Sequence, residues 1–251
     1  MRLHRFFIQD EEPMEVDHDI GVYNVDLLHQ WKNVFRLRTG DKVILLDNSG
    51  MEYLATIRSL TKEKAELEIG ESKAGLNIPS REIWLFAALV KKDNFEWILE
   101  KGTELGVSNF VPVVSERSEK KNLNMERAVK ITREASEQSG RGILPRVHDI
   151  VTLEEIFDPK APIAAGIENV QLIAFHPEGK PFDTQLFKSP SRKLGAGPMK
   201  TPIGVFIGPE GGWSEKENDL FTAKNIPIFS LGPQILRAET AAIAVASLLL
   251  L

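Results

Sequence analysis

Residues 201–251 repeat one local pattern twice, and this repeat constrains the fold more than any other feature of the chain. An apolar run at 203–207 breaks at the glycine- and proline-rich residues 208–212, and Ser214 with Glu217 then forms a capping box that predicts a helix. A second apolar run, 226–231, breaks at Gly232-Pro233, and residues 234–241 open the last helix. Both copies therefore read strand, Gly-Pro turn, polar residues, helix.

The two Gly-Pro turns are suited to binding a ligand. Each can expose backbone N–H groups, and the N-terminus of the following helix adds partial positive charge, which favours a small polar or anionic ligand. Neither turn matches the phosphate-binding patterns G-x-x-x-x-G-K-[ST] or G-x-G-x-x-G. A single Gly-Pro pair would simply end a strand. Two such loops at the ends of parallel strands instead predict a binding crevice.

The first part of the chain is rich in short strands. We expect strands at 6–8, 41–47, 51–57 and 65–69, with Asn48-Ser49-Gly50 as the turn of a hairpin. One helix is expected within residues 24–38, where apolar residues recur at helical spacing. These elements predict a small β-barrel domain over residues 1–73. Residues 73–80 lack periodicity and form the expected linker.

From residue 80 onward strands and helices alternate. The continuous apolar run 83–89 is typical of a strand buried on both faces. A helix capped by Asp93 and Glu96 should follow and stop at Gly106. Further strands are expected at 110–114, 147–151 and 170–175, the last ending at residues 176–179, with helices at 125–139 and 153–157. This alternation predicts an α/β domain with a parallel sheet covered by helices on both faces.

Two motifs in the C-terminal repeat resemble a known family. Residues 207–212 (Ile-Gly-Pro-Glu-Gly-Gly) and 231–241 (Leu-Gly-Pro-Gln-Ile-Leu-Arg-Ala-Glu-Thr-Ala) look like the paired signature of the RsmE family. These are SPOUT-superfamily methyltransferases that modify uridine N3 in small-subunit ribosomal RNA. The resemblance covers nearly the whole chain and is weakest over residues 158–202.

The resemblance implies an architecture, a cofactor and partners. Residues 1–73 would form a PUA-like RNA-binding domain, and residues 80–251 a SPOUT domain with a C-terminal trefoil knot. The implied cofactor is S-adenosylmethionine. The implied partners are 16S ribosomal RNA or the small ribosomal subunit, together with a second copy of the chain in a homodimer.

The resemblance also implies roles for single residues. Arg237 would stabilise charge on the uracil oxygen as N3 loses its proton, and Glu239 would assist that proton transfer; a simple ion pair at the helix start is the alternative. The implied cofactor-binding residues are Phe175, His176, Ile207, Gly208, Pro209, Gly211, Gly212, Leu231, Gly232, Ile235 and Leu236. The implied RNA-binding residues are Arg5, Arg36, Arg38, Lys91, Lys92 and Arg141. Ordinary solvated charge is the alternative for Arg5, Arg36 and Arg38, and a favourable interaction with the dipole of the preceding helix is the alternative for Arg141.

Two departures from the family pattern are visible. Gln234 stands where the family more often has arginine. The segment after Arg141, residues 142–145, is longer and more apolar than the usual connection to the next strand. The glutamine at position 234 would remove one RNA or phosphate contact, and the longer segment would change the geometry of the loop after Arg141.

Composition excludes several classes of protein. The chain has no cysteine, so it has no disulfide or thiolate site, and its five histidines lack metal-binding spacing, so no metal site is expected. A formal net charge of −5 argues against binding nucleic acid through bulk charge. The beginning lacks the apolar segment of a secretion signal, and the apolar run 241–251 is too short to cross a bilayer. We therefore expect a cytoplasmic protein with no membrane partner.

Two further functions stay open at this point. The first is a non-catalytic RNA-binding or ribosome-assembly module with a vestigial SPOUT pocket. The second is a nucleotide-binding enzyme of another kind, since crevices at sheet ends host many chemistries. A hydrolase has no support, because the chain lacks the G-x-S-x-G nucleophile motif.

Overall fold

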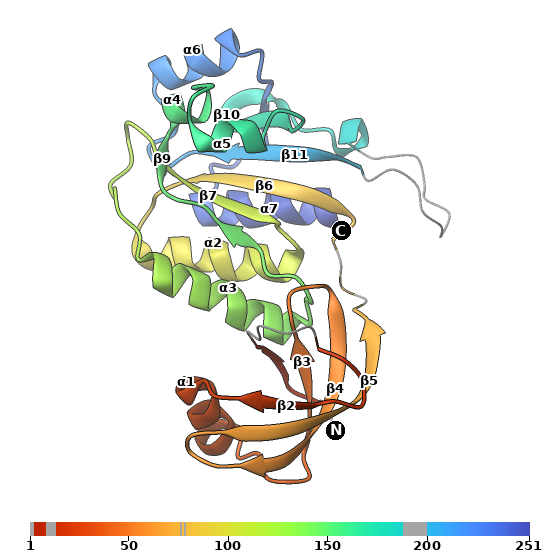
Figure 1. Cartoon of the computed structure of the whole chain (residues 1–251). Coiled ribbons are helices and arrows are strands. Elements are labelled where there is room, and N and C mark those ends of the chain that lie inside the picture. Colours follow the sequence, from red (N-terminus) through yellow and green to blue (C-terminus); the bar gives the residue numbers. More distant parts are fainter. Residues whose placement is uncertain (1–2, 9–13, 76, 78, 188–199) are drawn as a thin grey trace. The chain divides into compact units, whose positions relative to one another are not determined.

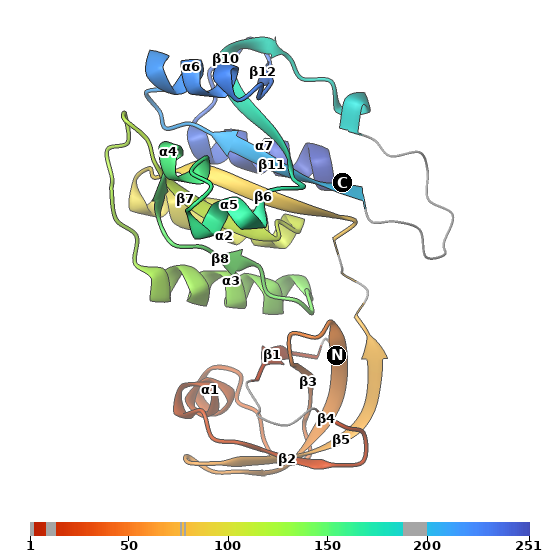
Figure 2. The same cartoon turned by 45° about the horizontal axis from the view of Figure 1, so that its top comes forward.

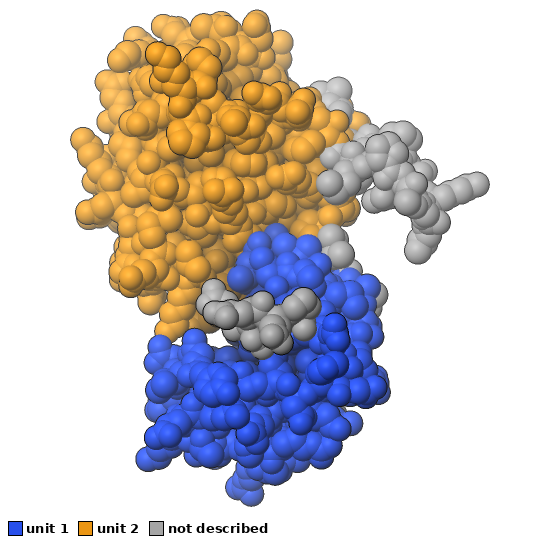
Figure 3. Space-filling model, viewed as in Figure 1, with its two compact units in different colours: residues 1–78, 136–144 blue, residues 79–135, 145–251 orange. Residues whose placement is uncertain are grey.

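The computed structural model describes residues 3–8, 14–75, 77, 79–187 and 200–251. It contains two compact units, drawn in blue and orange in Figure 3. Unit 1 comprises Met1–Ile78 with Ser136–Leu144, and unit 2 comprises Pro79–Ala135 with Pro145–Leu251. The dividing line in the second half thus falls within a helix, and the segment after it belongs to the first unit. The domain limits 1–73 and 80–251 stay a prediction.

Unit 1 is built around a five-stranded sheet in the order β1-β3-β4-β5-β2. Its elements are β1 (Arg5–Phe7), β2 (Asp19–Val22), α1 (Val25–His29), the π-helix η1 (Gln30–Val34), β3 (Lys42–Leu46), β4 (Met51–Leu60) and β5 (Ala65–Ala74). The predicted hairpin of β3 and β4 is confirmed, and Asn48 and Gly50 take positive φ angles in its turn. β2 is an additional strand that the sequence pattern did not predict, because four residues with a glycine among them give almost no periodic signal.

Unit 2 is built around a parallel sheet in the order β12-β10-β11-β6-β7-β8, with β9 also paired to β7 (Figure 1). Its strands are β6 (Arg81–Ala88), β7 (Asn109–Val114), β8 (Arg146–Val147), β9 (Val151–Thr152), β10 (Gln171–Pro181), β11 (Lys200–Ile207) and β12 (Ile228–Ser230). Its helices are α2 (Lys92–Leu105), α3 (Met125–Ser139, whose last residues belong to unit 1), α4 (Leu153–Ile156), α5 (Pro162–Gly166), the 3-10 turn η2 (Thr184–Phe187), α6 (Glu215–Ala223) and α7 (Ala238–Leu250). The predicted α/β fold with a parallel sheet is confirmed.

β6 lies in the middle of this sheet and is buried on both faces. Alternate side chains Ile83, Leu85 and Ala87 pack into one core with α2 and α7. Trp84, Phe86 and Ala88 face the opposite core, which α4, α5 and α6 cover. Figure 2 shows these two helical layers on either side of the strands. The continuous apolar run therefore has the physical cause that was predicted for it, since neither face of the strand meets water.

Two helix starts give opposite outcomes for the predicted caps. In α6 the capping box is present: the Ser214 hydroxyl accepts from the Glu217 backbone N–H at 3.2 Å, and the Glu217 carboxylate accepts from the Ser214 N–H at 2.7 Å. In α2 the predicted cap is wrong, because the helix begins at Lys92 and its N-cap, Lys91, makes no side-chain capping bond. Asp93 lies inside the first turn, where its charge favours the helix dipole without capping the end.

β10 does not end at residues 176–179, which corrects another prediction. Phe175 pairs with Phe229 of β12, and Lys180 pairs with Phe229 again, so the four residues between them bulge out of the ladder. At Gly179 an added Cβ would lie 2.5 Å from the Phe229 carbonyl carbon, so only glycine allows this approach of the two backbones. The bulge places His176 beside the end of β12.

Candidate active site

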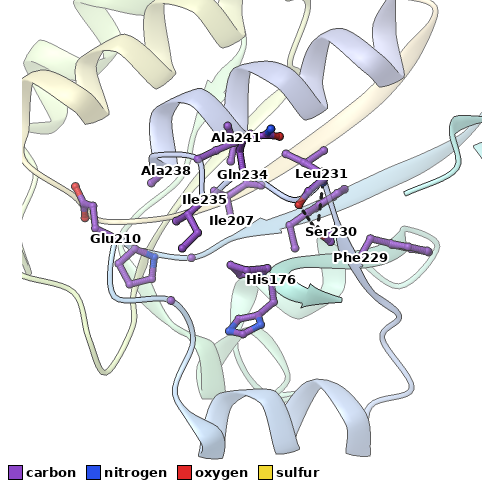
Figure 4. Close-up of a pocket in the computed structure, with 17 residues that line it drawn as sticks. His176, Ile207, Glu210, Phe229, Ser230, Leu231, Gln234, Ile235, Ala238 and Ala241 are labelled. Carbon is purple, nitrogen blue, oxygen red and sulfur yellow. Dashed lines mark hydrogen bonds between the residues drawn. The ribbon is translucent and has the colours of Figure 1, made fainter. Parts of the chain in front are cut away.

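One pocket lies at the carboxyl ends of β11 and β12 and beside the bulge of β10, where both Gly-Pro turns meet (Figure 4). Its lining residues are Phe175, His176, Pro177, Ile207, Gly208, Pro209, Glu210, Gly212, Phe229, Ser230, Leu231, Gly232, Gln234, Ile235, Leu236, Ala238 and Ala241. The structure therefore brings together every predicted cofactor-binding residue except Gly211. The enclosed volume is about 100 Å³, and Ile235 at its rim is 84% exposed. A ligand or partner would cover apolar side chains that now face solvent.

The first turn is held in place by the indole of Trp213. Trp213 is buried, and its Nε1 donates to the Phe175 backbone oxygen at 3.2 Å, which ties the turn to β10. Gly208 lies against the same ring, since an added Cβ would be 3.2 Å from the indole. Gly212 has a φ of 67° and donates to the Pro209 oxygen at 2.8 Å, closing the turn. Both glycines are thus required by conformation or space.

The second turn has its own hydrogen bonds. Gly232 has a φ of 133°, and its N–H donates to the Ser230 hydroxyl, which donates to the Gly232 oxygen at 3.1 Å. The dashed lines in Figure 4 mark bonds of Ser230. Residues 234–237 are not helical, so the last helix begins at Ala238 rather than at Gln234. Four non-helical residues after the turn leave Gln234, Ile235 and Leu236 free to line the pocket.

Arg117 is a residue of this site that the sequence analysis missed. Its Nη1 donates to the Gly211 oxygen at 2.8 Å and to the Trp213 oxygen at 3.3 Å, across a sequence separation of 94 and 96 residues. Next to it, the Glu116 N–H donates to the Glu217 carboxylate at 3.0 Å. Gly211 faces Arg117 rather than the pocket, which explains its absence from the lining. No local motif marks Arg117, because only the tertiary fold brings the loop after β7 to this turn.

The two predicted catalytic residues occupy different environments. Arg237 is the N-cap residue of α7 and its side chain is exposed. Glu239 lies in the first turn of α7, is 6% exposed, and its Oε2 finds no hydrogen-bond partner within the described part of the chain. Among the described residues no ion pair joins them. Neither side chain lines the pocket, although Ala238 between them does.

The six predicted RNA-binding residues divide into exposed and engaged groups. Arg36, Arg38, Lys91 and Lys92 are exposed. Arg5 is half-buried, and its Nε lies 3.0 Å from Glu52 in unit 1. Of the six, Arg36, Arg38 and Lys91 are exposed and form no ion pair within the described residues, whereas the exposed Lys92 lies 3.8 Å from the Glu96 carboxylate.

Arg141 is buried, with 4% of its surface exposed, and its Nε donates to the Ile143 oxygen at 2.7 Å. Burial lowers the pKa of Arg141 to about 10. The Leu144 N–H donates to the Asn48 side chain at 2.6 Å, and Gly142 approaches Gly50 so closely that a Cβ would lie 3.2 Å from its Cα. Residues 142–144 of the unusual segment are therefore part of unit 1, and Pro145 is the first residue after it that belongs to unit 2. A direct RNA contact by Arg141 stays a prediction and requires its guanidinium to leave this position.

Comparison with known proteins agrees with this architecture. A family model described as an RNA methyltransferase domain matches residues 77–250, and one described as an RNA methyltransferase PUA domain matches residues 32–70. Ribosomal RNA small subunit methyltransferase E from Bacillus subtilis is 31% identical, with 85% of this chain and 83% of the relative covered. Its counterpart from Synechocystis is 33% identical, with 85% and 67% covered.

Solved structures show the same fold over nearly the whole chain. Ribosomal RNA small subunit methyltransferase E from Neisseria gonorrhoeae, solved bound to S-adenosylmethionine, has 27% identity and a TM-score of 0.79, with 98% of this chain and 96% of that chain covered. Lpg2936 from Legionella pneumophila, with 23% identity and a TM-score of 0.82, shows the fold alone, and the match covers 99% of this chain and 97% of that chain.

No helix within the described residues is long and apolar enough to cross a membrane.

The two family models match successive parts of the chain, residues 32–70 and 77–250, and the two relatives are similar over at least 67% of their own length. The resemblance first seen in the two Gly-Pro motifs thus extends to sequence, domain order and fold. The chain belongs to the ribosomal RNA small subunit methyltransferase E (RsmE) family of RNA methyltransferases.

Proposed function

We propose that this protein transfers the methyl group of S-adenosylmethionine to N3 of a uridine in 16S ribosomal RNA. The observation that carries the proposal is the convergence on one pocket of two Gly-Pro turns, which follow the parallel strands β11 and β12 on either side of β10, in a chain of this family. The relative from Neisseria gonorrhoeae, solved with S-adenosylmethionine, supports the choice of cofactor.

The chemistry of the pocket fits this cofactor. Leu231, Leu236 and Ile207 offer apolar surfaces for the two faces of an adenine, with Phe175 behind them. The adenine edge and the methionine tail would be held by backbone groups around four glycines, namely Gly208, Gly211, Gly212 and Gly232. At Gly212 an added Cβ would only touch the His176 ring, at 3.5 Å, so it is the positive φ of 67° that favours glycine there. His176, Pro209 and Ile235 complete the wall.

Catalysis in this site rests on positioning and charge. Bound S-adenosylmethionine supplies an electrophilic methyl carbon, so the protein must orient the uracil and help to remove its N3 proton. Arg237, exposed at the start of α7, would stabilise the negative charge that develops on the uracil oxygen. Glu239 would assist the proton transfer, and its buried, unpartnered oxygen supports this role within the described residues.

The pocket also motivates a proposal about assembly. Ile235 and Leu236 are 84% and 37% exposed, although both line the pocket. We expect a second copy of the chain to cover this side, so that the active enzyme is a homodimer, and we expect a trefoil knot around β10, β11 and β12. A crystal structure with cofactor tests both features, and sedimentation tests the dimer in solution. Because the proposed substrate is ribosomal RNA, we expect the protein to act in the cytoplasm.

The decisive experiment analyses ribosomal RNA nucleosides from a strain that lacks the gene, using mass spectrometry. One N3-methyluridine should disappear from 16S RNA and return when the wild-type gene is restored. Calorimetry should show that the purified protein binds S-adenosylmethionine but not NAD or ATP. A protein that restores ribosome assembly without restoring any methylated base would instead support a non-catalytic assembly module.

A further inference from the structure

A second cavity lies between α2 and α3 in unit 2, two helices that run side by side in Figures 1 and 2. Its volume is about 570 Å³, which is in the range of sites for small ligands. Its lining residues are Leu89, Val90, Lys92, Phe95, Glu96, Leu99, Lys120, Asn122, Leu123, Asn124, Arg127 and Ala128. None of them lines the pocket of the Gly-Pro turns, so the two cavities are separate.

The cavity combines an apolar floor with a positive rim. Leu89, Val90 and Leu99 form part of the floor and belong to the buried core beneath it. Among the lining residues, Lys92, Lys120 and Arg127 stand with one carboxylate, that of Glu96, while Glu134 and Asp93 nearby reduce the positive excess at Arg127. This local excess is notable in a chain whose formal net charge is −5. It favours an anionic ligand that also carries an apolar part.

Glu96 fixes the plane of the Arg127 guanidinium. Its two carboxylate oxygens accept from Nε and Nη2 of Arg127, each at 2.5 Å, which is a bidentate pair. The hydrogen bonds from Arg127 lower the pKa of Glu96, so the pair remains charged at neutral pH. Glu96 is largely covered, whereas the Arg127 side chain is 51% exposed. The guanidinium therefore presents a flat face whose orientation is already set.

The other polar groups at the rim suit a nucleotide. Lys120 is exposed and forms no ion pair with any described residue, so its charge is available to a phosphate. The Asn124 side chain accepts from the Arg127 N–H at 3.0 Å and so caps α3, whose N-terminus adds partial positive charge there. Asn122 offers both a donor and an acceptor for the edge of a base.

We propose that the α2–α3 cavity binds a nucleotide of the RNA substrate other than the one that is methylated. The base would enter the apolar cavity and stack on Arg127, while its phosphate would contact Lys120 and Lys92. Proteins recognise single-stranded RNA in this way, by stacking unpaired bases on flat side chains and neutralising phosphates with cations. This inference rests on the proposed function, since it assumes an RNA substrate.

The first test uses uridine and uridine 5′-monophosphate as probes, followed by NMR of the Leu99 and Ala128 methyl groups. The monophosphate should shift both signals. Lys120→Glu should weaken binding of the monophosphate and leave binding of the nucleoside unchanged. Arg127→Lys keeps the charge and removes the flat face, so it should weaken binding of both probes by at least about fivefold. Lys160→Glu is the matched control, because Lys160 is exposed elsewhere in unit 2. Absence of any shift in wild-type protein would overturn the proposal.

The second test measures affinity for 16S RNA over a range of salt concentrations, with calorimetry of S-adenosylmethionine alongside. Lys120→Glu should weaken RNA binding and reduce the salt slope by about one unit, with cofactor affinity unchanged, and Lys160→Glu should leave the slope intact. Equal behaviour of the two variants would overturn the cavity assignment. The assignment would also be overturned if Lys120→Glu bound free RNA normally but lost binding to assembled subunits, because the cavity would then bind a ribosomal protein. If wild-type protein fails to bind cofactor or methylate RNA while nucleotides still occupy the cavity, the methyltransferase proposal fails instead.

Discussion

Arg237 and Glu239 stand two positions apart at the start of α7, yet one is exposed and the other is buried. Because no ion pair joins them among the described residues, removal of Arg237 should not destabilise the helix start through a lost salt bridge. We expect Arg237→Ala to reduce single-turnover methyl transfer by about a hundredfold to a thousandfold, as removal of one preorganised donor typically does. Cofactor affinity and melting temperature should change little. Near-normal turnover in a stable Arg237→Ala protein would rule out the catalytic role, and Arg237→Lys tests whether charge alone suffices.

Arg117 is a second single residue whose role can be tested, because it holds the backbone of another loop. Its two hydrogen bonds hold the turn that contains Gly211 and Gly212, so Arg117→Ala should let that turn move. We expect the dissociation constant for S-adenosylmethionine to rise about tenfold, since hydrogen bonds from charged donors typically contribute about 1.5–3 kcal/mol and these are partly exposed. Calorimetry measures the effect, with Lys130→Ala as a control for removing an exposed charge. Unchanged affinity would show that the turn keeps its shape without Arg117.

At the scale of elements, the close approach of β10 and β12 depends on Gly179. A methyl group there would meet the backbone of Phe229, which cannot rotate away as a side chain could. Gly179→Ala should therefore lower the free energy of unfolding by about 1–3 kcal/mol, the typical effect of overpacking. Urea unfolding measures the change. Gly70→Ala in β5 is the control, because the nearest atom there lies 4.0 Å from the added carbon.

The starts of β6 and β7 carry a pH-dependent element. His148 packs against Trp84, with ring centroids 4.9 Å apart and ring planes tilted by 32°, and it hydrogen-bonds the Asn109 side chain at 2.9 Å. Burial, reinforced by the charge of Arg146, lowers the pKa of His148 to about 4. The unfolded chain binds a proton near pH 6.5 and the folded chain only near pH 4, so His148 contributes stability above pH 6.5 that is lost as the pH falls between these values.

We therefore expect urea midpoints of the wild-type protein to fall between pH 7 and pH 5. His148→Gln retains a side chain that can reach Asn109 and cannot titrate in this range, so its midpoint should fall less. An equal fall in both proteins would assign the pH dependence to other groups.

At the scale of the whole molecule, an acidic chain must bind an acidic polymer. Local cations can achieve this, and the exposed Arg36 and Arg38 of unit 1 are candidates. Arg36→Ala and Arg38→Ala should each reduce the slope of log affinity against log salt by about one unit. Arg141→Ala tests the predicted contact of the buried Arg141: a smaller slope would show that its guanidinium leaves Ile143 to meet RNA, and lower stability with an unchanged slope would limit Arg141 to a structural role. An unchanged slope in both surface variants would place the RNA face elsewhere.

The sequence by itself determined the fold class, the family and most of the pocket. Hydrophobic periodicity and turn residues are local signals, so the strand buried on both faces, the hairpin turn of Asn48 and Gly50, and the α6 capping box could all be predicted. The paired Gly-Pro motifs contain most of the residues that line the pocket, because glycine and proline report backbone geometry directly, whereas Phe175, His176, Pro177, Phe229 and Ser230 lie outside them.

Only the tertiary structure decided which side chains are available. The burial of Arg141, the pairing of Arg5 with Glu52 and the approach of Arg117 to Gly211 depend on segments far apart in the chain. The same holds for the bulge of β10, which follows from its contact with Phe229, and for the α2–α3 cavity. A charged residue gives the same local pattern whether it is solvated, paired or buried, and long-range packing alone distinguishes these states.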